Sequence, residues 1–135
     1  MAGGITALRQ LRPDAAHALE EALDRAAAAD PDGLLELCRA RVRTLLGGSV
    51  DSADPRLRAV SGYATSDLFT DTERLAIEFA EQYVLDVANM PDDLVAELRE
   101  RLGTEGVYAF AMGLYAIDQA ERLDVSAAVH PGVTA

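Results

Sequence analysis

The stretch TDTERLAIEFAEQYV, residues 70–84, decides the fold class of this chain. Thr70 and Glu73 have the spacing of a capping box, in which the threonine hydroxyl and the glutamate carboxylate each accept a hydrogen bond from a free backbone N–H at the start of a helix. Apolar side chains follow at helical spacing, among them Ile77, Ala80 and Val84. The stretch therefore predicts a long helix with one buried face.

The residues after this stretch predict two further helices. Pro91 favours a helix start, because its missing N–H costs nothing in the first turn, and leucines at every fourth position over 94–102 form a stripe on one face. Gly103 then separates this helix from another over about residues 105–123. The segment VYAFAMGLYAI, residues 107–117, is apolar on nearly all sides, so we expect it to lie at the centre of the domain or to face another subunit.

The residues before residue 70 predict three more helices. A proline and an aspartate begin a helix over 13–29, and DPDG then separates it from a second helix over about 33–46. The glycine pair at 47 and 48 ends the second helix, because glycine permits the left-handed backbone of a helix C-terminus. A short helix follows over about 52–62.

No stretch of the sequence predicts a β-strand, an internal repeat or a domain linker. We therefore expect one all-α domain over residues 1–135 with about six helices. Residues 1–12 are expected to form a short leader, and residues 124–135 a tail that is loose in a monomer.

Charge and hydropathy limit the possible partners. The formal net charge is −11, every cation is an arginine, and no basic patch forms beyond the three arginines of residues 39–43. Nucleic acids and anionic membrane surfaces would repel such a chain. No run of about 18 apolar residues could span a bilayer, and the N-terminus lacks the apolar core of a signal peptide. We expect a cytoplasmic protein.

Cysteine and histidine are too few for a redox pair or a metal centre. Cys38 is the only cysteine, so one chain can form no disulfide, CxxC pair or thiolate zinc site. His17 and His130 lie far apart in the sequence, and neither has an assigned role. We therefore expect no metal and no cofactor.

Four segments of the chain share features with one known family. They are ELCRARV (36–42), DLFTDTERLAIEFAEQYV (67–84), MPDDLVAELRERLG (90–103) and a buried helix that ends in AIDQAERL (116–123). Together they resemble the carboxymuconolactone decarboxylase and alkylhydroperoxidase-like superfamily, over about residues 33–123. The resemblance implies an all-helical domain with orthogonally packed helices, assembly as trimers or hexamers, and an active site near a subunit interface.

The residues of the family's peroxidase site are mostly absent. Glu36 matches the family's proton-relay glutamate, but its two CxxC cysteines would fall at Gly48 and Asp51, and its histidine at Pro55. We therefore expect no peroxidase activity of the usual kind. Cys38 is a poor substitute, because an unpaired cysteine on an apolar helix stripe behaves as a small hydrophobic residue with a raised thiol pKa.

Glu36 has two interpretations. In the first, it lies on a solvated ion-pair face with Arg39 and Arg43, three and seven residues further along the helix. In the second, it lies in a cleft beside the glycine turn, where Asp51 is close enough to separate the two carboxyl pKa values and allow general acid–base catalysis. A hard cation held by these carboxylates and Asp54 is not expected, because their spacing matches no known loop.

Two classes of function are open. In one, the chain is a redox-inactive member of the family that acts as an oligomeric binding or accessory protein. In the other, it is a cofactor-free lyase or isomerase of small acids or lactones, with Glu36 and Asp51 as catalytic residues. A peroxidase that uses Cys38 is a third, less favoured possibility. The expected partners are copies of the chain, in a trimer or hexamer, and a small-molecule ligand.

Overall fold

The computed structural model describes residues 3–30 and 32–129, and over these ranges the chain contains helices and no β-strand. The α-helices are α1 (Gly3–Leu11), α2 (Pro13–Ala28), α3 (Leu34–Leu45), α4 (Pro55–Arg58), α5 (Asp71–Asp86) and α6 (Asp92–Val129). Two 3-10 helices, η1 (Val60–Gly62) and η2 (Val87–Asn89), follow α4 and α5. The predicted all-α class is confirmed, whereas orthogonal packing of the family's type stays a prediction.

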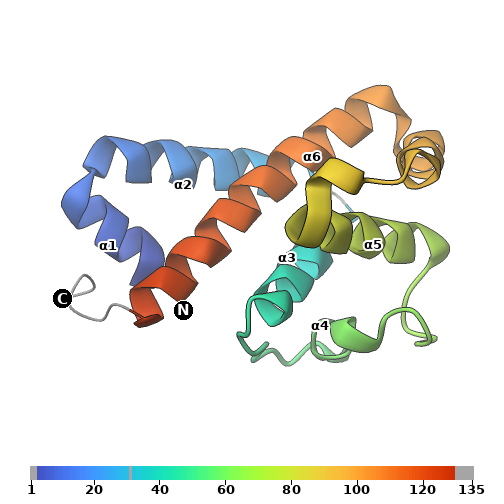
Figure 1. The fold of residues 1–135 in the computed structure, drawn as a ribbon, viewed down its shortest axis with the longest axis horizontal. Helices are drawn as coiled ribbons and strands as arrows, with labels where there is room; N and C mark the ends of the chain where they lie inside the picture. The colour runs from blue at the N-terminus through green and yellow to red at the C-terminus, as the bar shows by residue number, and fades with distance from the viewer. Residues whose placement is uncertain (1–2, 31, 130–135) are drawn as a thin grey trace.

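The long helix α6 connects the two ends of the domain (Figure 1). At one end, α1 and α2 form a hairpin that packs against α6. Towards the other end, α3 and α5 pack against each other and against α6, with α4 at the periphery. None of the described helices is long and apolar enough to cross a membrane.

The helix boundaries follow the local signals in the sequence. The capping box is present at the start of α5: Glu73 N–H donates to Thr70 Oγ1 at 3.1 Å, and Thr70 N–H donates to Glu73 Oε1 at 2.8 Å. Gly47 has a φ of +91° directly after α3, as expected of a glycine C-cap. Gly103 has a φ of +78° and bends α6 where the sequence predicts a break between two helices.

The two ends of the domain contain more helix than the sequence predicts. The expected leader contains α1, and α6 continues to Val129 through the first half of the expected tail, whose residues 130–135 lie outside the described part of the chain. The helix α1 contacts the last turns of α6, where the Gly4 N–H donates to Asp124 Oδ1 at 2.9 Å. Tertiary packing thus stabilises α1, whose nine residues would be marginal as an isolated helix.

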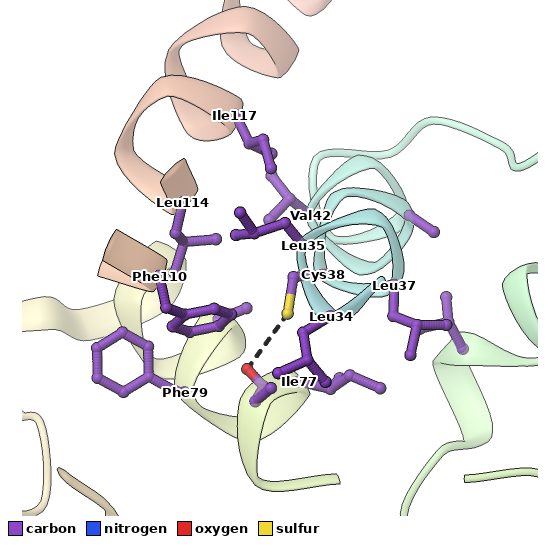
Figure 2. Packing of buried hydrophobic residues seen from close by; sticks show 14 of the residues in the cluster. Leu34, Leu35, Leu37, Cys38, Val42, Ile77, Phe79, Phe110, Leu114 and Ile117 are labelled. Atoms are coloured by element: carbon purple, nitrogen blue, oxygen red, sulfur yellow. Dashed lines mark hydrogen bonds between the residues drawn. The ribbon is translucent and has the colours of Figure 1, made fainter. Parts of the chain in front are cut away.

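The core lies between α3, α5 and α6 (Figure 2). The fully buried side chains include Val42, Ile77 and Leu114, one from each of these helices. Phe79 and Phe110 pack edge to face with ring centroids 5.7 Å apart, a favoured geometry for two aromatic rings. This packing fixes the position of α3, the helix that carries Glu36, Arg39 and Arg43.

The apolar segment 107–117 is not buried on all sides. Its Leu114 and Ile117 are buried, but Tyr108, Met112 and Tyr115 are 71%, 68% and 54% exposed. These three residues, which we call the α6 apolar stripe, follow one another at intervals of four and three residues and therefore lie on one face of the helix. The segment is therefore buried on one face, as expected of a central helix, and exposed on another.

We predict that Gly4→Ala destabilises the protein. A Cβ atom at Gly4 would lie 2.4 Å from the backbone nitrogen of Asp124, so α1 would have to move away from α6. We expect a loss of about 1–3 kcal/mol in the free energy of unfolding, the usual cost of overpacking, measured by urea denaturation followed by circular dichroism. Gly62→Ala is the matched control, because a Cβ there meets no atom within 4 Å. Equal stability of the two variants would contradict the described packing of α1.

Candidate functional site

A cavity of about 620 Å³ lies at the C-terminal end of α3. One side is formed by Arg43, the turn over residues 46–49 and Asp51, and the other by Glu121, Asp124, Val125 and Ala128 of α6. We call it the α3–α6 cavity. Gly48 and Asp51, the positions that the predicted resemblance assigns to two cysteines, both belong to its lining.

Glu121 is the most unusual residue of this cavity, because a carboxylate is rarely fully buried without partners. Its side chain is 2% exposed and accepts three hydrogen bonds from two arginines of α3. Arg39 Nε donates to Oε2 at 2.8 Å, while Arg43 Nε donates to Oε1 at 2.8 Å and Arg43 Nη2 to Oε2 at 3.0 Å. We call Glu121, Arg39 and Arg43 the Glu121 cluster.

Glu121 remains ionised at neutral pH. Burial alone would raise the pKa of Glu121, but the hydrogen bonds and charges of Arg43 and Arg39 outweigh burial and hold the pKa below its ordinary value of 4.5. The hydrogen bond with Glu121 in turn raises the pKa of Arg43. The cluster is therefore a charged link between α3 and α6.

The arrangement of Arg43 also limits what position 48 can hold. A Cβ atom at Gly48 would lie 2.8 Å from Arg43 Cγ and 3.2 Å from the Arg43 carbonyl oxygen. A cysteine there would require Arg43 to shift. A cysteine at position 48 would therefore overlap with Arg43 in the position that Arg43 has in the Glu121 cluster.

The structure does not bring Glu36 and Asp51 into one site. Glu36 is exposed in the first turn of α3 and lines a separate cavity of about 300 Å³, together with Asp30 and Arg39. Asp51 is exposed beyond the other end of α3 and lines the α3–α6 cavity. From Glu36 to Leu45, the last residue of α3, the helix rises by roughly 14 Å at 1.5 Å per residue.

The arginines that the sequence pairs with Glu36 have a different partner. Arg39 and Arg43 donate to Glu121 instead, and Arg43 is half-buried against α6. The first interpretation of Glu36, an ion-pair face shared with Arg39 and Arg43, is therefore wrong. A surface carboxylate gains little from exposed arginines, whereas a buried one requires them.

Cys38 is a core residue, as the sequence indicates. Its side chain is fully buried, and its Sγ donates to the backbone carbonyl of Ala76 at 3.4 Å (Figure 2). Burial strongly raises the pKa of the thiol, with a further contribution from the charge of Asp30. The thiolate, which is the nucleophilic form, is thus disfavoured.

Of the two histidines, His17 lies in the part of the chain that the structure describes. His17 is exposed, with its Nε2 3.1 Å from Glu21 Oε1, and His130 lies outside the described residues. In the part of the chain that the structure describes, no three histidine, cysteine, aspartate or glutamate side chains gather as they would around a metal ion.

Glu121 is the site residue that the sequence predictions miss, although a signal for it exists. It continues the stripe of Phe110, Leu114 and Ile117 at intervals of four, three and four residues. All three residues are buried, and a carboxylate on such a stripe calls for a cationic partner. Arg39 and Arg43 lie one turn apart on another helix, so the pair can be recognised only once both helices are placed.

Comparisons of the chain with protein-family models, with curated proteins and with solved structures give no match. The resemblance to the carboxymuconolactone decarboxylase and alkylhydroperoxidase-like superfamily therefore stays a prediction, carried by the quoted segments.

We predict that Glu121→Gln lowers the free energy of unfolding by about 1–3 kcal/mol at pH 7, because it leaves two arginines facing a neutral amide. The folded pKa of Glu121 is depressed, so its stabilisation is present above the unfolded value and is lost as the pH falls through the folded value. The difference between the wild type and the variant should therefore shrink below about pH 4.5.

Urea denaturation at several pH values would measure this effect. Glu20→Gln is the matched control, since Glu20 forms an exposed ion pair with Arg9. Similar losses in both variants would show that the buried Glu121 cluster is no more important than a surface ion pair.

Proposed function

We propose that this chain is a redox-inactive, alkylhydroperoxidase-like protein of the cytoplasm that binds a small molecule in the α3–α6 cavity and works as an oligomer. One observation carries the proposal: the cavity is lined by the two positions at which the family would place its thiols, Gly48 and Asp51. Its volume of about 620 Å³ falls within the range of small-molecule sites, about 300–1,000 Å³.

Two further observations favour binding over thiol chemistry. Cys38 is fully buried, so it is unavailable to a peroxide. At position 48, the space next to the backbone is taken by Arg43. The ion pair with Glu121 holds Arg43 in that position. This arrangement favours a binding pocket over a thiol site.

The alternative function, a lyase or isomerase that uses Glu36 and Asp51 together, has less support. The two carboxylates line different cavities at opposite ends of α3. General acid and base groups have to reach the same substrate, by direct hydrogen bonds or through one water.

The α6 apolar stripe supports the oligomeric part of the proposal. Tyr108, Met112 and Tyr115 are each more than half exposed, and burial of such side chains contributes about 1.5–3 kcal/mol each. Contiguous exposed apolar side chains are typical of interaction surfaces. A second copy of the chain would cover them.

We predict that the α3–α6 cavity binds small fragments and that Ala128→Phe abolishes this binding. Ala128 is an exposed residue that lines the cavity, so a phenyl ring there can fill it without disturbing the core. The measurement is a screen of neutral fragments by two-dimensional NMR, with shifts expected at Gly47, Gly48 and Val125.

Ala96→Phe is the matched control, because Ala96 is exposed on the same helix and lines none of the cavities described above. Hits should be retained in this variant. A screen without hits near residues 46–51, or hits that Ala128→Phe leaves unchanged, would contradict a binding function for this cavity.

We predict that Met112→Glu converts the oligomer into monomers without unfolding it, since a carboxylate at the centre of the α6 apolar stripe is costly to bury. Sedimentation velocity of the untagged chain would measure the change, with circular dichroism as a test of folding. Leu11→Glu, at an apolar position that is 66% exposed on α1, is the control and should leave the assembly intact. A monomeric wild type would refute the oligomeric part of the proposal.

A further inference from the structure

The lining of the α3–α6 cavity combines an apolar wall with charged groups. Leu46, Val125 and Ala128 supply apolar surface, and the charged side chains are Arg43 together with three carboxylates. Sites of this composition hold the body of a ligand by apolar contact and fix its orientation by a few polar groups. The sign of the net charge of the lining then indicates whether a cation or an anion would bind.

Arg43 is the only cation that the described residues supply to the lining, and it is already paired. Two of the three guanidinium nitrogens of Arg43, Nε and Nη2, donate to Glu121 at 2.8 and 3.0 Å. Arg39 binds the same carboxylate from outside the lining. An anionic ligand would have to compete with a buried, pre-positioned carboxylate for Arg43.

The other two carboxylates of the lining form no ion pair with any residue that the structure describes, although the charge of Asp124 contributes to the raised pKa of Arg43. Asp51 forms no hydrogen bond or ion pair with any residue that the structure describes. Asp124 accepts the Gly4 N–H through Oδ1, and within residues 3–30 and 32–129 no arginine forms an ion pair with it. The Glu121 cluster, with two arginines and one carboxylate, has a charge of +1, and the two aspartates add −2, so the lining together with Arg39 has a net charge of −1.

Two longer-range effects act in the same direction. The C-terminal end of α3, at Leu45, leads directly into the cavity turn over residues 46–49, and a helix C-terminus carries a partial negative charge. The formal net charge of −11 adds a negative potential that attracts cations and repels anions.

We propose that the ligand of the α3–α6 cavity is a small organic cation, an amine with an apolar body. Its ammonium group binds Asp51, with Asp124 as a second acceptor, and its apolar body lies against Leu46, Val125 and Ala128. This assignment rests on the proposed binding function and names its ligand class. It differs from the small acids and lactones that the family resemblance implies.

The test compares matched alkylamines and alkanoates of the same chain length, hexylammonium with hexanoate and octylammonium with octanoate, by isothermal titration calorimetry on the full chain at pH 7. The amines should bind saturably and the alkanoates should not. Asp51→Asn should weaken amine binding about tenfold, the loss expected for one charge-assisted hydrogen bond. Asp67→Asn, an exposed position away from the cavity lining, should leave the affinity unchanged.

The outcomes separate this inference from the proposed function. Preferential binding of alkanoates, or amine binding that Asp51→Asn leaves unchanged, overturns the assignment of a cation. If the amines fail while neutral fragments still bind in a manner sensitive to Ala128→Phe, the cavity is a binding site for another ligand class. If neither amines nor neutral fragments bind, both the ligand class and the binding function are wrong.

Discussion

The buried carboxylate of Glu121 determines how α3 packs against α6. A carboxylate with 2% exposure would destabilise the folded state unless cations reached it, because desolvation of an unpaired charge costs several kcal/mol. Arg39 and Arg43 reach it from α3, so α3 is held at a fixed distance and rotation relative to α6. The adjacent face of α3 carries Cys38 and Val42 into the core, where the Cys38 thiol donates to the Ala76 carbonyl of α5.

The same pairing shapes the candidate site. Because Arg43 turns towards Glu121, its side chain lies over Gly48 and the turn after α3 remains open as a cavity wall. The helix α3 is thus followed by a pair of glycines and by Asp51, which pairs with no residue that the structure describes. Arg43 is the residue that α3 contributes to the lining of the cavity.

The parts of the fold that depend on neighbouring residues could be predicted from the sequence. Thr70 with Glu73 marks the start of α5, and Gly47 and Gly103 mark breaks, because each signal acts within one turn of the chain. The helix α1 could not be predicted, since its stability comes from contact with α6. Nor could the Glu121 cluster, whose partners lie 78 and 82 residues apart in sequence. Glu36 and Asp51 are close in sequence, but a rigid helix separates them.

The contact between Gly4 and Asp124 closes a loop of 120 residues. Most contacts in a helical domain join residues near in sequence, and such contacts form quickly. The docking of α1 on α6 instead requires closure of almost the whole chain, whose entropic cost increases with loop length. The last turns of α6 supply Asp124, Val125 and Ala128 to the cavity. We therefore expect this wall of the cavity to form late in folding, after α1 has docked on the last turns of α6.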